Sequence, residues 1–320
     1  MAGLLLIGAA AEAEGLFARL ARPLSNGGPV VVLAGLLGLD ALVSAVMNLD
    51  TAAAFMTPLM LYAARGLGAD EAPFLYGAVL MANAASLYLP GSNLTNLLVE
   101  GGQVSGAEFF GRMLSPALIA TAVTGVGLLA WAARMRGHHA GPVASPPPHE
   151  WRPGVGVAAV AVAAVLVVAL RAPALPVLAL GVVAGALRLD RRAFLQAVGP
   201  FLLLALLAVA VALGTLAREI DLVLDTSRQA TAAIAAGASV VVNNLPAATL
   251  LSAHPPLHPR ALLIGLDLGP NLAVTGSLSA LIWWRSARRL GARPSALTYS
   301  LVGAPLAIVA ITLATLSLPG

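Results

Sequence analysis

The chain has 320 residues, of which 59% are hydrophobic and only 10% are charged, whereas a soluble domain carries about 25% charged residues. This composition argues against a soluble enzyme, and the 18 basic residues, all arginines scattered between apolar runs, argue against a partner nucleic acid. The absence of cysteine excludes disulfide frameworks and thiol catalysis. The sequence therefore predicts an all-α polytopic membrane protein embedded in a lipid bilayer.

A membrane-spanning helix needs about 20 mainly apolar residues. Eight segments fit this requirement, and in chain order they are residues 2–20, 74–98, 116–133, 154–170, 174–187, 194–217, 261–284 and 296–318. Two further apolar stretches, 29–64 and 230–253, each carry a polar interruption and leave halves too short to cross alone. We predict two re-entrant hairpins with polar tips at mid-depth, where non-helical backbone is tolerated only beside protein or a cavity.

The polar residues of the two hairpin tips are the first candidates for substrate binding. The first tip contains Asn48, Asp50 and Thr51, and the second contains Asn243 and Asn244. Such residues also cap helices by accepting hydrogen bonds from free backbone N–H groups. Helix N-termini hold polar substrates in membrane transporters, so capping and binding are compatible roles.

Two of the predicted spans contain polar breaks, and these supply the second set of candidates. Residues 74–98 contain Gly91, Ser92 and Asn93, and residues 261–284 contain Gly276 and Ser277. The alternative is a kink or a small-residue packing face. Because such dense amides and hydroxyls are costly in lipid, we predict two broken helices that face a binding cavity.

The two halves of the chain repeat the same order of hairpin and broken helix. We predict a first repeat over residues 1–134, a linker over 135–153 and a second repeat over 154–320. Asn48 corresponds to Asn243 with an offset of 195 (243 − 48), and Ser92 to Ser277 with an offset of 185 (277 − 92). The second repeat starts with two helices that have no counterpart, so the first repeat is expected to lack them. Opposite orientations of the two halves would form an inverted-repeat secondary transporter.

Charge predicts the orientation of the chain. Threading it with both hairpins re-entrant places 13 of the 18 arginines on the side of the linker. The positive-inside rule then makes the linker cytoplasmic and places the C-terminus on the outer side of the inner membrane.

Two acids within the predicted membrane segments, Asp50 and Asp267, are the candidate proton-coupling residues. Neither has a basic residue nearby in its own segment, and an unpaired carboxyl in a membrane is a functional candidate by default. The alternatives are a helix cap for Asp50 and an interhelical hydrogen bond for Asp267; Asp40 is a weaker third candidate. Glu12 and Glu14 read as part of an interfacial ion cluster. The histidines all fall in loops, and no metal site is predicted.

Four motifs in order, "NLDTAAAFMTP", "ANAASLYLPGSNLTNLLV", "SVVVNNLPAATLL" and "DLGPNLAVTGSLSALIWW", resemble the arsenite efflux permeases of the ion-transporter superfamily. The resemblance implies export of arsenous or antimonous acid by proton antiport, with the proton motive force and no cofactor. It implies a site between the two tips and the two breaks, a homodimer, and an arsenite-stimulated ATPase as a partner in some members. The sequence departs from that family at Leu49, which separates Asn48 from Asp50, and at Asn271, where lysine is common.

Other functions stay open. A different superfamily member would carry a dicarboxylate or another anion, or exchange sodium for protons, and a shortened chain could be an inactive remnant. An intramembrane enzyme is disfavoured, because the chain has no HExxH motif and no histidine within a span.

Overall fold

The computed structural model describes residues 2–23, 27–100, 104–135, 154–169, 174–198, 200–219 and 225–319. Within these ranges the chain forms helices joined by turns, with no strand, which confirms the predicted all-α class. The predicted linker 135–153 lies outside the described residues apart from Met135.

The helices of the first half are α1 (Ala2–Ala13), α2 (Leu16–Ala21), α3 (Pro29–Val46), α4 (Leu49–Gly66), α5 (Glu71–Ala85), the 3₁₀ helix η2 (Pro90–Ser92), α6 (Leu94–Glu100) and α7 (Gly106–Arg134). Those of the second half are α8 (Val155–Ala169), α9 (Ala174–Arg188), α10 (Arg191–Val198), α11 (Pro200–Glu219), α12 (Arg228–Val242), α13 (Asn244–Leu251), α14 (Pro259–Leu268), the 3₁₀ helix η3 (Gly269–Leu272), α15 (Leu278–Arg289) and α16 (Ala296–Leu316).

Two predicted spans are interrupted in the structure. The segment 2–20 was expected as one helix, but Gly15 adopts a left-handed φ of 75° and separates α1 from α2, a conformation that glycine adopts readily. The segment 194–217 is divided between α10 and α11, and Pro200 occupies the first position of α11, where its fixed φ favours the start of a helix.

By length and composition, three described helices can cross a membrane: α3, α7 and α16. The last two match the predicted spans 116–133 and 296–318. Helices α8 and α9 have 15 residues each and are short of the usual length. The predicted total of eight spans is therefore not confirmed over the described residues.

Both predicted hairpins are pairs of helices that meet at an asparagine. The stretch 29–64 forms α3 and α4 with Asn48 between them, and 230–253 forms α12 and α13 with Asn243 between them. The expectation that neither arm could cross a membrane alone is wrong for α3, which has 18 residues and a mean hydropathy of 2.2.

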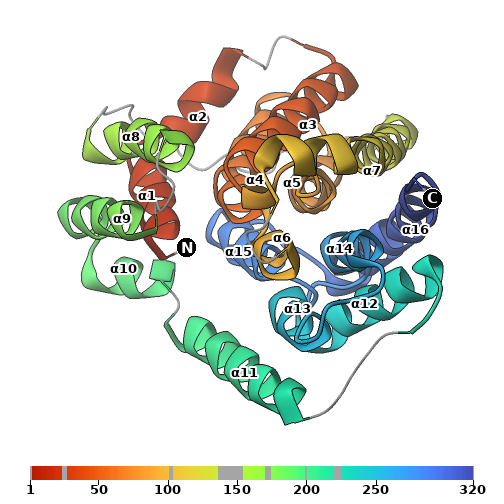
Figure 1. Cartoon of the computed structure of the whole chain (residues 1–320). Helices are drawn as coiled ribbons and strands as arrows, with labels where there is room; N and C mark the ends of the chain where they lie inside the picture. Colours follow the sequence, from red (N-terminus) through yellow and green to blue (C-terminus); the bar gives the residue numbers. More distant parts are fainter. Residues whose placement is uncertain are drawn as a thin grey trace.

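The two halves interlock around the centre of the molecule (Figure 1). Helix α1 packs with α8, α9 and α10 on one side, while α4 packs against α15, α7 against α16, and α6 against α13 and α14. The carboxylate of Glu14 is buried, accepts hydrogen bonds from the backbone of Gly156 and Val157 at 3.0 and 2.8 Å, and pairs with Arg188 at 2.6 Å. Glu14 therefore caps α8 and joins three helices, which corrects its assignment to an interfacial ion cluster.

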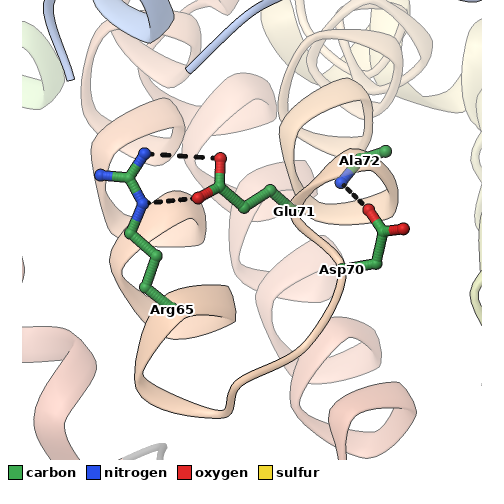
Figure 2. Close-up of polar contacts among 4 residues, drawn as sticks. All are labelled: Arg65, Asp70, Glu71 and Ala72. Carbon is green, nitrogen blue, oxygen red and sulfur yellow. Dashed lines mark hydrogen bonds and ion pairs between the residues drawn. The ribbon is translucent and has the colours of Figure 1, made fainter. Parts of the chain in front are cut away.

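A short turn holds the first hairpin against the first broken helix (Figure 2). Arg65 at the end of α4 binds Glu71 through two contacts, Nε to Oε1 at 2.6 Å and Nη2 to Oε2 at 3.4 Å. Asp70 caps α5 by accepting a hydrogen bond from the Ala72 N–H at 2.8 Å. This fork-shaped pairing fixes both orientation and distance, so α4 and α5 are held as one antiparallel unit.

Small residues hold the second hairpin against the second broken helix. Gly265 of α14 and Gly269, the first residue of η3, lie against Ala232 and Ala236 of α12, so closely that a β-carbon on Gly265 would collide with the carbonyl oxygen of Ala232. Small residues four apart on both helices permit such an approach of two backbones. The second tip is thereby held beside the second break.

Candidate functional site

The asparagine at each hairpin tip caps the helix that follows it. The Asn48 side chain accepts hydrogen bonds from the backbone N–H and the hydroxyl of Thr51, at 2.8 and 2.9 Å. The Asn243 side chain accepts from the Leu245 N–H at 3.4 Å, and its amide donates to the carbonyl of Thr275 at 3.2 Å. The capping role is confirmed for both residues.

Asn243 has a φ of 77° and is the one described residue other than glycine with a positive φ. Such a conformation persists only where surrounding contacts hold it. Here the next residue, Asn244, donates its backbone N–H to the carbonyl of Gly276 at 2.8 Å. The second tip is thus fastened to the second break.

Each break consists of a 3₁₀ turn followed by a new helix with a polar cap. Asn93 precedes α6 and its side chain accepts from the Thr95 N–H at 3.3 Å, while Ser277 precedes α15 and its hydroxyl accepts from the Ala280 N–H at 3.1 Å. The counterpart of Ser277 is therefore Asn93, and the predicted pairing of Ser277 with Ser92 is wrong by one residue. The Ser92 hydroxyl, with its one hydrogen, lies within hydrogen-bond reach of the carbonyls of both Ser86 and Leu89, so Ser92 closes the 3₁₀ turn.

Asp267 is fully buried and accepts three hydrogen bonds from the first break. Asn93 and Thr95 donate to its Oδ1 at 2.8 and 2.6 Å, and Ser86 donates to its Oδ2 at 3.1 Å. Three side chains from the other half of the chain thus surround this carboxyl, and none of them carries a charge. The predicted alternative, a hydrogen bond to a neighbouring helix, is confirmed.

Asn83 in the first half makes contacts with the second half that are equivalent to those of Asp267 with the first half. It accepts a hydrogen bond from the Ser279 hydroxyl at 3.1 Å and donates to the Asn271 side chain at 2.8 Å. The pair Asn83–Ser279 matches the pair Asp267–Thr95, since 267 − 83 and 279 − 95 both equal 184. Asn83 thus binds the second residue of α15, and Asp267 binds the second residue of α6. Two halves related by a two-fold axis would make such matching contacts.

A small cavity of about 30 Å³ lies where the two tips and the two breaks meet; we call it the tip cavity. The residues that line it are Leu49, Asp50, Asn93, Leu94, Asn243, Asn244, Leu245, Ser277, Leu278 and Ser279. All ten belong to the first residues or the caps of four helices, α4, α6, α13 and α15. The tip cavity therefore combines amides, hydroxyls and helix N-termini, with Asp50 as its one charged lining residue.

The structure brings together five of the predicted site residues, namely Asp50, Asn93, Asn243, Asn244 and Ser277. The other six lie outside the lining: Asn48, Thr51, Gly91, Ser92, Gly276 and Asp267. Ser279 lines the cavity and is hydrogen-bonded to Asn83, and neither residue was predicted. Asn83 could have been found in the sequence, because it is an amide within the apolar span 74–98 and occupies the position equivalent to Asp267.

The chain matches the sequence model of the CitMHS family, described as citrate transporter, over residues 1–265. The match covers the first repeat and the second hairpin, and it ends two residues before Asp267. No curated protein matches the chain. The resemblance to arsenite efflux permeases is thus not confirmed as such, whereas a permease of the ion-transporter type is. With more than half of its length matched, the chain belongs to the CitMHS citrate transporter family and is a multi-pass membrane transporter.

Proposed function

We propose that the chain is a proton-coupled secondary carrier, and that the tip cavity, about 30 Å³ in this structure, widens to bind a citrate-type polycarboxylate. The observation that carries this proposal is the convergence of helix N-termini: α4, α13 and α15, with 18, 8 and 12 residues, all begin at the cavity wall. Each N-terminus acts as roughly half a positive charge. Three of them attract carboxylates although no arginine lines the cavity.

Asn244 is the side chain best placed to contact the solute. It lines the tip cavity and is 5% exposed, and its amide makes no hydrogen bond with a described residue. An amide that no protein group satisfies is free to bind a ligand oxygen.

Asp50 is the proposed proton-carrying group. Its carboxylate lines the cavity, and no described residue is a hydrogen-bond partner of it. Asp267 lies behind the wall and reaches the cavity through Asn93, which lines it. We therefore assign Asp267 to the positioning of Asn93, and its predicted direct part in proton coupling becomes the second alternative.

Export of arsenite or antimonite is the second candidate function. Arsenous acid is uncharged and carries three hydroxyls, and five of the ten lining side chains of the cavity are amides or hydroxyls, while none is a cation. Proton antiport from the cytoplasmic side of the inner membrane, an arsenite-stimulated ATPase partner and a homodimer belong to this proposal. Sodium coupling belongs to the anion carrier as an alternative.

The test is uptake by proteoliposomes under an imposed pH gradient, with citrate and arsenite offered separately. Citrate uptake that collapses with an uncoupler supports the first function, and arsenite uptake alone supports the second. Asn244→Ala is expected to raise the KM about tenfold, because a hydrogen bond to a charged group contributes about 1.5–3 kcal/mol. Ser252→Ala is the matched control, since the Ser252 hydroxyl bonds its own helix at Ala248. Uptake of neither solute by well-folded protein would refute both functions.

A further inference from the structure

Five arginines surround an open groove between α10 and the last turns of α15. We call it the arginine groove; it has a volume of about 970 Å³ and is lined by Arg191, Arg192, Arg285, Arg288 and Arg289 with Leu195, Gln196 and Pro200. No acid is among these lining residues. None of the five guanidinium groups has a hydrogen bond or ion pair with a residue that the structure describes. The groove therefore concentrates positive charge that lacks a protein counter-charge.

A second pocket, which we call the connecting pocket, shares lining residues with the arginine groove and with the tip cavity. This connecting pocket, of about 80 Å³, lies between α1, α4, α10 and α15. It shares Gln196, Arg285 and Arg289 with the arginine groove, and it shares Leu278 with the tip cavity. The three hollows are thus neighbours along α15.

One face of α15 runs along the whole series. Arg289, Arg285, Ile282 and Leu278 are spaced by four, three and four residues, and residues at this spacing lie on one side of a helix. Eleven residues of helix correspond to about 17 Å. Arg289 therefore stands about 17 Å along α15 from Leu278 at the tip cavity.

We propose that the arginine groove is the mouth of the substrate path, and that it captures a multiply charged carboxylate anion for the tip cavity. The inference rests on the proposed citrate-type function. A recess of one charge sign raises the local concentration of an oppositely charged solute, and the effect grows with the charge of that solute. Arsenous acid, which is neutral, would gain nothing from it. All five arginines fall on the predicted linker side, so the capture acts on solute from that side.

The apolar part of the connecting pocket is consistent with a path and not with a second tight site. Its wall carries Leu5, Ala54, Pro58 and Ile282. Its one acid, Glu12, accepts a hydrogen bond from the Tyr62 hydroxyl at 2.6 Å. An anion held at the arginines would therefore move toward the helix N-termini of the tip cavity without meeting another cationic side chain.

The experiment measures citrate uptake by the full-length protein in vesicles of both orientations, for wild type and for the double variant Arg288→Gln/Arg289→Gln. We expect the KM to rise about tenfold where the groove faces the bath, with kcat unchanged, because the variant removes long-range attraction. The KM measured from the opposite membrane face stays within twofold. Arg19→Gln, at an exposed arginine on the same predicted side, is the matched control and is expected to leave both KM values unchanged. Arg191→Gln/Arg192→Gln tests the opposite wall of the groove if the first variant does not fold.

Each outcome decides the inference. Wild-type protein that carries arsenite and not citrate refutes the proposed anion function and the capture together. Wild-type protein that carries citrate, with variants of unchanged KM, refutes the capture alone. The same series of variants is measured in vesicles of neutral lipid and in vesicles with phosphatidylglycerol. This comparison distinguishes capture of the solute from binding of lipid phosphate. A KM change that appears only with the anionic lipid would mean that the groove binds lipid head groups, and it would overturn the inference.

Discussion

Two buried acids that look alike in the sequence have different surroundings in the structure. Asp50 faces the tip cavity without a hydrogen-bond partner among the described residues, whereas Asp267 is enclosed by Ser86, Asn93 and Thr95. A carboxyl that gains and loses a proton must reach the solute path, and only the first lies on it. The three donors around Asp267 stabilise one fixed arrangement of the first break.

Asp50→Asn is therefore expected to abolish citrate uptake driven by a pH gradient and to leave citrate counterflow, which moves no net protons, within about threefold. Asp267→Asn is expected to retain gradient-driven uptake, since an amide can keep the bonds from Asn93 and Thr95 and donate to Ser86. Asp40→Asn, at the third candidate acid, which is fully buried outside the cavity, is expected to retain gradient-driven uptake as well. Gradient-driven uptake that survives in Asp50→Asn but not in Asp267→Asn would reverse the assignment.

At the scale of helices, the position of the second hairpin depends on a close crossing of α12 and α14. The alanines and glycines at this crossing leave no room for a side chain, so the two helices act as one unit that carries Asn243 and Asn244. The first hairpin is held differently, by the paired Arg65 and Glu71 at the turn into α5. Both arrangements fasten a tip to the break of its own half.

Gly265→Val is expected to destabilise the fold by about 1–3 kcal/mol, the usual cost of forcing extra carbon atoms into a packed contact. Thermal unfolding in detergent should show a lower Tm and, in protein that still folds, weaker citrate binding. Gly237→Ala on α12, where no atom lies within 4 Å of the added carbon, should leave the Tm unchanged or raise it slightly. Equal Tm values for the two variants would contradict the close crossing.

For the whole molecule, the decisive feature is that elements from both halves complete one site. Helices α4 and α6 of the first half and α13 and α15 of the second begin at the same cavity. Asn83 and Asp267 bind across the halves in matching ways. Such matching contacts between the halves are expected of an inverted repeat. An inverted repeat also requires that equivalent loops open on opposite sides of the membrane.

The sidedness can be measured cleanly, because the chain has no cysteine and each introduced thiol is unique. Gly66→Cys and Arg293→Cys are expected to react with an impermeant maleimide from the cytoplasmic side. Gly106→Cys and Ala253→Cys are expected to react only from the other side. If Gly66→Cys and Gly106→Cys were labelled from the same side, the first broken helix would not cross the membrane and the predicted topology would be refuted.

Local chemistry in the sequence was sufficient to predict the hairpins and the breaks. Asn48 and Asn243 interrupt apolar runs, and Pro90 and Pro270 stand at the 3₁₀ turns; these residue types end or cap helices whatever surrounds them. Gly15 was missed because one glycine inside an apolar run does not by itself end a helix. The resemblance to arsenite permeases and the match to citrate transporters agree on the type of carrier and differ on the substrate.

The sequence by itself determined the class of the protein and the location of its polar breaks, because hydropathy and capping act over a few neighbouring residues. Only the tertiary structure decided which polar side chains face the solute. Ser92 turns inward to backbone carbonyls while Asn93, one residue later, lines the tip cavity, and Ser279 enters the site through Asn83 of the other half. The arginine groove likewise combines residues 191 and 192 with residues 285, 288 and 289. Such convergence depends on how helices pack across the two halves, and no local pattern in the chain contains that information.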